Sequence, residues 1–164
     1  MSDLPPESEM VPEAMAEPAR AGTLRGLSSE DWAWLAQNAK ERQFGDGEAI
    51  VRQGDRVAAL YILSAGAVRV EHPGEDGETV VLARLGRGAM LGEMSFVDTA
   101  PANVNVICEG AVAALAIDAR VLAQMINGNL EFGFRFYRSV AHTLSQRLRA
   151  TTALKQQPDR FVWV

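Results

Sequence analysis

Apolar residues recur at helical spacing near both ends of the chain and at strand spacing between them. Near the N-terminal end, Trp32, Leu35 and Ala39 follow one another at intervals of three and four residues. Ser28 or Ser29 can cap a helix there, and acidic residues in its first turn suit the positive end of the helix dipole. The pattern predicts an amphipathic helix from about residue 29 to residue 41.

Between Phe44 and Asp118 the pattern changes to short apolar runs separated by glycine and other turn-forming residues. Val68 and Val70 alternate with charged residues, which is the period of a half-buried antiparallel strand. Closely spaced strands with short connections indicate a mainly β domain with flanking helices, built as an antiparallel β-roll of the double-stranded β-helix or jelly-roll type. The expected strands are Ala49–Arg52, Ala59–Leu63, Ala67–Glu71, Thr79–Leu85, Asn103–Cys108 and Val112–Ile117.

Helical spacing returns after Asp118, which can cap a short helix that Asn127-Gly128-Asn129 interrupts. A long helix from about 130 to 155 follows and carries two apolar stripes. We expect one stripe to pack on the roll and the other to meet the same helix of a second copy, which predicts a homodimer. The alternative is one broad stripe that only covers the core of the monomer. The first stripe is Leu130, Phe134, Tyr137, Ala141, Leu144 and Leu148, and the second is Phe132, Phe136 and Val140.

Composition separates the first 22 residues from the rest of the 164-residue chain, whose net charge is −5. This segment holds five acids, one base and four of the seven prolines, so we expect a disordered acidic tail over residues 1–22. Without that tail the net charge is close to zero, which does not favour a nucleic-acid surface. We expect one domain over residues 23–157 and a short tail over 158–164.

Several classes of protein lack support in this sequence. No apolar run reaches the roughly 18 residues of a membrane span, and the acidic N-terminal segment does not resemble a signal peptide. We therefore expect a cytoplasmic protein with no membrane association. The single cysteine, Cys108, has no partner for a disulfide or a zinc motif and fits a core position. Neither metal-ligand spacing nor a catalytic constellation is evident, so we expect no enzyme activity, no metal and no cofactor.

The segment from Leu85 to Phe96 could carry binding chemistry because three glycines precede residues that can begin a helical turn. Free backbone N–H groups in such a turn can bind an anion, and glycine lets a phosphate approach closely. The spacing fits neither a dinucleotide fingerprint nor a phosphate-binding P-loop. From the residues alone the segment indicates an anion site of unspecified kind.

Four motifs follow one another along the chain: FGDGE at 44–48, QGD at 53–55, LYIL at 60–63 and LGEMSF at 91–96. In this order they resemble the cyclic-nucleotide-binding domain of catabolite-activator-type regulators, protein kinase A regulatory subunits and gated channels, and the resemblance covers roughly residues 27–152. It implies that backbone amides of Gly92, Met94 and Ser95 hold a cyclic phosphate and that Glu93 accepts the ribose 2′-hydroxyl. The implied ligand is cAMP or cGMP. The alternative for Glu93 is a favourable charge at the start of a helix.

The chain departs from the family pattern where the phosphate-binding arginine belongs. Ala102 stands in its place and Asn105 replaces the family's threonine. Loss of a charge-assisted guanidinium–phosphate contact should weaken binding by roughly 10- to 100-fold. Arg87 in the glycine-rich loop is a possible compensating phosphate contact, and the side-chain amides of Asn103 and Asn105 could donate hydrogen bonds.

We therefore predict a stand-alone sensory or regulatory module with weak or altered nucleotide binding and an unknown protein partner. The alternative is a ligand-free dimeric interaction module of the same fold. The catabolite-activator relatives carry a DNA-reading helix-turn-helix after their long helix. Because Pro158 ends the helix here and only Asp159–Val164 follow, we expect no direct DNA binding.

Overall fold

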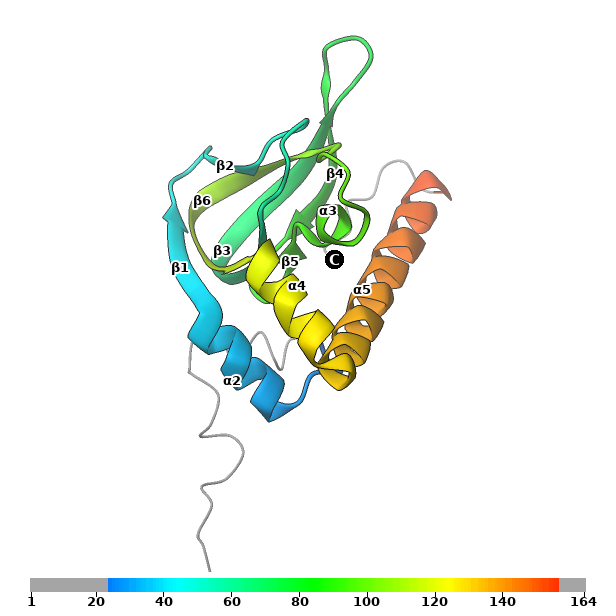
Figure 1. Ribbon diagram of the computed structural model, residues 1–164. Coiled ribbons are helices and arrows are strands. Elements are labelled where there is room, and N and C mark those ends of the chain that lie inside the picture. Colours follow the sequence, from blue (N-terminus) through cyan, green and yellow to red (C-terminus); the bar gives the residue numbers. More distant parts are fainter. Residues whose placement is uncertain (1–23, 157–164) are drawn as a thin grey trace, which may run out of the picture.

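The computed structural model describes residues 24–156, and Figure 1 shows a curved β-sheet flanked by helices. The expected acidic tail (1–22) and the short tail (158–164) lie outside the described residues. The helices are α2 (Ser29–Asn38), α3 (Glu93–Asp98), α4 (Ala119–Gly128) and α5 (Leu130–Gln156). The strands are β1 (Ala39–Phe44), β2 (Ala49–Val51), β3 (Ala59–Pro73), β4 (Thr79–Leu85), β5 (Met90–Leu91) and β6 (Asn105–Asp118).

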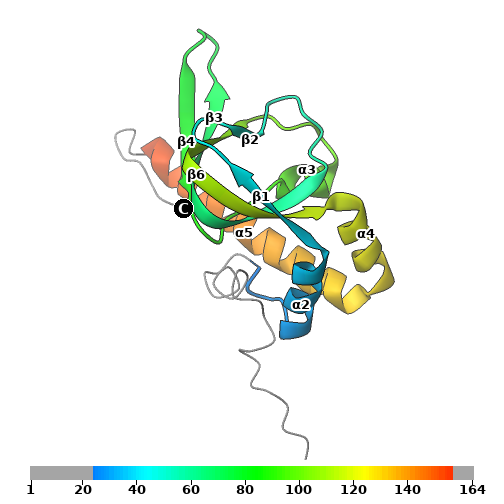
Figure 2. The same ribbon diagram turned by 90° about the vertical axis from the view of Figure 1, so that its left-hand side faces the viewer.

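All of the described strand pairs are antiparallel, and the sheet has six strands. Its main order is β1-β6-β3-β4, while β2 pairs with β6 and β5 pairs with β3. The sheet is not closed, and the long helix α5 lies along one side of it (Figures 1 and 2). The predicted fold class, mainly antiparallel β with flanking helices and a long C-terminal helix, is confirmed.

Two pairs of predicted strands are in fact two long strands. The segments predicted at 59–63 and 67–71 belong to β3. Those predicted at 103–108 and 112–117 belong to β6, except that residues 103 and 104 precede this strand. Gly66 and Gly110, which resemble turn residues in the sequence, have φ values of 84° and 77° inside these strands. The β3–β6 register shifts between residues 63 and 67. These glycines therefore bend long strands instead of ending them.

The first helix is shorter than its apolar spacing predicts. Ser28, one of the two caps that the sequence offers, begins the helix in a capping box with Asp31, but the helix ends at Asn38. Residues 39–41 belong to β1, a strand that the sequence analysis missed, and Ala39 pairs with Ile117 of β6. Pairing with β6 satisfies the backbone groups of β1, which outweighs the local preference of this polar segment for continuing the helix.

The two apolar stripes of α5 have different environments. Phe132, Phe136 and Val140 are fully buried in a core shared with α2, α4, β3 and β6. On the other stripe, Leu130 is 81% exposed, Phe134 66% and Leu148 68%. The stripe of Phe132, Phe136 and Val140 is thus the one that packs on the domain. Among the described residues, none of the helices is long and apolar enough to cross a membrane.

Candidate functional site

The segment from Met90 to Asp98, called here the cassette, contains β5, Gly92 and α3. Gly92 precedes α3 with φ 85°. A Cβ atom at this position would lie 2.8 Å from the carbonyl oxygen of Ala59 and 3.0 Å from Cγ1 of Val57. Both the left-handed backbone and the close approach to β3 require glycine here. Gly92 therefore fixes where α3 begins relative to the sheet.

Glu93, the first residue of α3, is only 4% exposed although it carries a carboxylate. Its partner is Arg147 from the last part of α5, which donates a hydrogen bond to Oε1 of Glu93. The same guanidinium donates to the carbonyl oxygen of Met90 at 2.6 Å. A buried carboxylate is costly unless it is paired and hydrogen-bonded, so Arg147 both neutralises Glu93 and joins α5 to the cassette.

Sequence analysis did not identify Arg147 as a site residue. It lies 54 residues beyond Glu93 and resembles a solvated base on an exposed helix face. One signal was available. Four of the buried positions of α5 lie on one line: Phe132, Phe136, Val140 and Thr143 step by four, four and three, and the next step of four reaches Arg147. A charged residue that continues an inward stripe needs a partner inside the fold.

The other cassette residues named from the sequence lie in varied surroundings. The side chain of Met94 is 51% exposed. Ser95 is half-buried, its carbonyl oxygen accepts a hydrogen bond from the Thr99 N–H at 2.9 Å, and it lines a pocket between α3, α4 and α5. Arg87 is exposed in the turn ahead of β5. Gly92, Glu93, Met94 and Ser95 follow one another at the start of α3, and Glu93 is the buried residue among these four.

The segment with the missing arginine is held against the loop after β2. The carbonyl oxygen of Ala102 accepts from the N–H of Gly54 at 2.7 Å, and the Ala102 N–H donates to the carbonyl of Asp55 at 2.9 Å. Asn105 accepts a hydrogen bond from the N–H of Gln53 through Oδ1 at 2.8 Å. The methyl group of Ala102 packs against the core inside the sheet. Asn105 therefore has a structural contact, whereas Asn103 is exposed.

Cys108 is fully buried, as expected of a core residue. Burial raises the pKa of its thiol, and the nearby carboxylates of Glu48 and Asp46 raise it further, which disfavours the nucleophilic thiolate. Over the described residues 24–156, no group of three or more His, Cys, Asp or Glu side chains is arranged to hold a metal ion. The arrangement offers backbone amides, one buried carboxylate and one guanidinium, which suits binding.

The family model of the cyclic nucleotide-binding domain matches residues 41–129, which is more than half of the chain. The chain therefore belongs to the cyclic nucleotide-binding domain family, a sensory and regulatory family rather than a catalytic one. The match includes the cassette and the segment that contains Ala102.

Similar proteins include both bacterial and eukaryotic regulators. The chain is 29% identical over 123 residues to the cyclic AMP receptor protein of Thermus thermophilus, covering 75% of this chain and 53% of that protein. It is 29% identical over 104 residues to the cAMP-dependent protein kinase type II regulatory subunit of Drosophila melanogaster, covering 63% of this chain and 27% of that protein. The chain thus spans about half or less of the length of these relatives.

Solved structures agree with this assignment. The crystal structure of Thermus thermophilus catabolite activator protein superposes with a TM-score of 0.70 at 26% identity, covering 82% of this chain and 62% of that one. A cyclic nucleotide-binding domain from Methylobacillus flagellatus gives a TM-score of 0.78 at 19% identity, covering 96% and 88%. The second likeness concerns the fold alone.

Proposed function

We propose that the protein is a regulatory module in which a cyclic nucleotide binds at the cassette and changes how firmly α5 is held. The observation that carries the proposal is the Glu93 carboxylate, which belongs to the cassette and is bonded to Arg147 of α5. One carboxylate would then serve both the ligand and the helix. The relatives named for cAMP and cyclic AMP reception support the ligand class.

The chemistry of Glu93 allows this double use. A carboxylate has two oxygens and about four acceptor sites, and Arg147 bonds to Oε1 alone. A ribose hydroxyl could donate to Oε2 or replace the guanidinium at Oε1. In either case the ligand alters the charge density that holds Arg147. Occupancy of the cassette and the position of α5 are then linked in both directions, with a coupling of about 1–3 kcal/mol.

We expect weak nucleotide affinity because Ala102 offers no cation to the cyclic phosphate. With a loss of about 2 kcal/mol from a good site, the dissociation constant should be tens of micromolar or weaker. Arg87 is the candidate for partial compensation, since it is exposed in the loop ahead of the cassette.

Calorimetric titration with cAMP and cGMP tests the proposal. Ala102→Arg should tighten binding by about tenfold, because it restores a charge-assisted bond to the phosphate. Adding Glu93→Gln to that variant should remove much of the gain, because the ribose and phosphate contacts hold one rigid ligand. Gln124→Arg is the control: it adds the same charge at an exposed position of α4, outside the proposed site, and should leave the affinity nearly unchanged.

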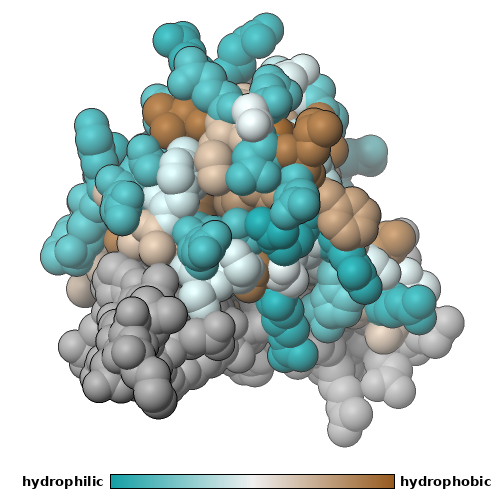
Figure 3. Space-filling model, turned by 60° about the horizontal axis from the view of Figure 1, so that its bottom comes forward, coloured by the Kyte–Doolittle hydropathy of each residue, from teal (hydrophilic) through white to brown (hydrophobic). Residues whose placement is uncertain are grey.

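A second proposal concerns α5 itself: its exposed stripe forms a homodimer interface. Leu130, Phe134 and Leu148 are too exposed to serve the core of one monomer. Leu130 and Phe134 line a groove of about 620 Å³ at the start of α5, together with Tyr137. The end of the molecule where α4 meets α5 comes forward in Figure 3 and shows separate apolar patches among polar side chains. A second copy of α5 would cover a stripe of this length.

Sedimentation velocity tests the dimer. The wild type should sediment as a dimer at tens of micromolar, and Leu148→Glu should shift it toward monomer while its strand-type circular dichroism is kept. Gln146→Glu is the control, since it adds the same charge at an exposed position on another face of α5. A wild type that is already monomeric at this concentration contradicts the dimer.

The alternative function is an interaction module without a nucleotide. Ala102 favours it, because the family's main phosphate ligand is absent, and so does the exposed stripe of α5. The same titration separates the two functions. If Ala102→Arg is folded and still binds neither nucleotide at millimolar concentration, the interaction module replaces the receptor.

A further inference from the structure

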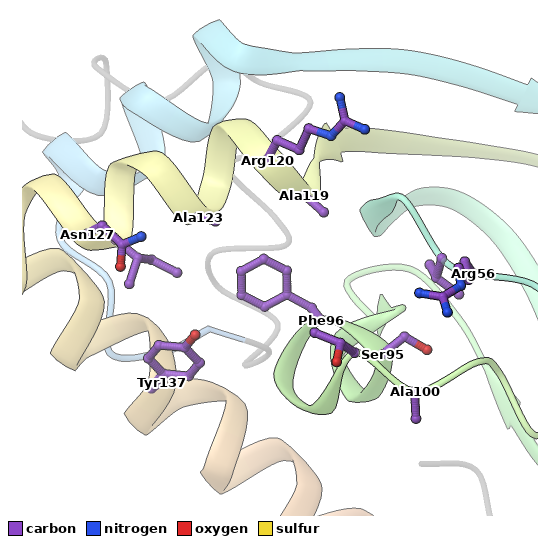
Figure 4. Close-up of a pocket in the computed structure, with 12 residues that line it drawn as sticks. Arg56, Ser95, Phe96, Ala100, Ala119, Arg120, Ala123, Asn127 and Tyr137 are labelled. Atoms are coloured by element: carbon purple, nitrogen blue, oxygen red, sulfur yellow. The ribbon is translucent and has the colours of Figure 1, made fainter.

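A pocket of about 410 Å³ lies between α3, α4 and α5, and its lining includes Ser95, Phe96 and Tyr137. Its size falls within the range of pockets that hold small organic ligands. Figure 4 shows the ring of Phe96 near the centre, with Asn127 of α4 and Tyr137 of α5 on one side and Arg56 on the other. The carboxylate of Glu93 does not line it, so this pocket differs from the ribose acceptor discussed above.

The aromatic ring at the centre of the pocket is held in place from α5. Phe96 meets Phe136 edge-on at a centroid distance of 5.7 Å and stacks on Tyr137 at 6.4 Å with an interplanar angle of 29°. Because Ala119 and Ala123 carry small side chains, the wall that α4 contributes leaves room beside the ring. A flat apolar group could therefore pack against Phe96 at little entropic cost, since the ring is already oriented.

One end of the pocket is positively charged and the other is polar but neutral. Arg56 is exposed, and within residues 24–156 its side chain has neither an ion-pair nor a hydrogen-bond partner. Arg120, at the start of α4, adds a second positive charge, although Figure 4 shows it pointing away from Phe96. At the opposite end, the Asn127 amide and the Tyr137 hydroxyl offer both donors and acceptors.

We propose that this pocket binds a small planar aromatic anion. Its ring packs against Phe96 beside Tyr137, and its carboxylate pairs with the guanidinium of Arg56. A guanidinium binds a carboxylate through charge-assisted and often bidentate hydrogen bonds, which an uncharged ligand of the same shape does not form. Because the ligand touches both α3 and α5, its binding also holds these helices together.

The test uses 1-naphthoate as the probe and its uncharged amide, 1-naphthamide, as the matched ligand. Titration followed by ¹H–¹⁵N NMR of the full chain should give saturable one-to-one binding of naphthoate, with a dissociation constant of about 1 mM or tighter. Backbone signals of α3 and of the first turns of α4 should shift. The amide should bind about tenfold more weakly.

Two variants locate the site. Arg56→Gln should weaken naphthoate about tenfold and leave naphthamide unchanged, whereas Arg52→Gln, an exposed arginine in the same loop and outside the pocket, should change neither. Ala123→Leu, at a half-buried helical position, should fill the pocket and abolish both.

Three results would overturn the proposal. In the first, naphthoate and naphthamide bind equally well. In the second, Arg56→Gln binds naphthoate as the wild type does. In the third, naphthoate shifts the NMR signals of Leu130 and Phe134, and these shifts disappear in Phe134→Ser but persist in Ala123→Leu. That result would mean that naphthoate adsorbs on the exposed stripe of α5.

Discussion

The two halves of α5 are held to the rest of the molecule in opposite ways. The first half inserts Phe132 and Phe136 into the core, where Phe132 meets Trp34 of α2 edge-on at 5.7 Å. It is also fixed by Arg135, which donates to both carboxylate oxygens of Asp31 at 2.6 and 2.9 Å. Beyond Thr143, Leu144 is only partly buried against the core, and the guanidinium of Arg147 donates to Glu93 and to the carbonyl oxygen of Met90.

This difference indicates which half of α5 can respond to a ligand. The packing of Phe132 against Trp34 of α2 involves no residue of the cassette, so we expect the start of α5 to stay in place whether or not a ligand is bound. The two hydrogen bonds of the Arg147 guanidinium can be exchanged for bonds to other partners at modest cost, so the second half can be released. A long helix that is fixed at its start and held at its end by exchangeable hydrogen bonds can convert a local change of contact into a larger displacement of that end.

The largest expected effect is loss of the aromatic anchor in the first half. Phe136→Ala should lower the free energy of unfolding by about 3–5 kcal/mol, because it empties a fully buried site. The control change in the second half, Gln146→Ala, should alter it by less than about 0.5 kcal/mol, because that side chain is exposed and lies off the apolar stripe. Urea denaturation followed by circular dichroism measures both variants, and equal losses would contradict the comparison.

The next effect concerns the ion pair of the first half and depends on pH. Burial disfavours the charge of Asp31, but hydrogen bonds from Arg135 and from the Ser28 N–H together hold the pKa of this carboxyl below its usual value. Asp31→Asn should lower the free energy of unfolding by about 1–2 kcal/mol at pH 7. The effect is limited because the Arg135 guanidinium is partly exposed, so solvent screens its attraction to Asp31.

The sign of the pH dependence follows from the lowered pKa. A group that is more acidic in the folded state contributes its stability fully above the unfolded-state pKa, near pH 4, and loses it as the pH falls through the folded-state value. The gap between wild type and Asp31→Asn should therefore be constant from pH 6 to pH 5 and shrink below about pH 4. A gap that widens in acid would show that another group dominates.

A smaller effect on the free energy of unfolding is expected when the contact of Arg147 with the cassette is removed. Arg147→Gln should cost about 1 kcal/mol, because the end of α5 can open locally and let water reach Glu93. Amide exchange over residues 143–153 should accelerate, while exchange over 132–140 stays as in the wild type. Arg149→Gln, an exposed arginine on the same helix, is the control and should change neither segment.

The smallest effect is expected from the acidic N-terminal segment. Deleting residues 1–22 keeps Leu24, which is fully buried in the core beside the first half of α5. Acidic, proline-rich chain cannot recover its ordering entropy by apolar burial, so the melting temperature should change by no more than about 2 °C. A substantial fall in a thermal melt would reveal contacts made by this segment.

Much of the architecture was readable from local patterns. The apolar runs placed the strand region between Phe44 and Asp118, and Asp118 was correctly identified as a cap, since its Oδ1 accepts from the Arg120 N–H at 2.7 Å. The ordered glycine motifs predicted the family. Strand β1 was missed because AKERQF carries little apolar alternation, and its conformation follows from pairing with β6.

The sequence by itself determined the succession of a helix, a strand region and two further helices, the glycine-rich segment ahead of Glu93 and the existence of two stripes on α5. Only the tertiary structure decided which stripe lies in the core and that Arg147 reaches Glu93 across 54 residues of chain. The physical reason is that periodicity places residues on a face of their own helix, whereas what covers that face depends on elements distant in sequence. Arg147, which the sequence places among the solvated bases of α5, forms an ion pair because the fold puts the buried Glu93 carboxylate opposite it.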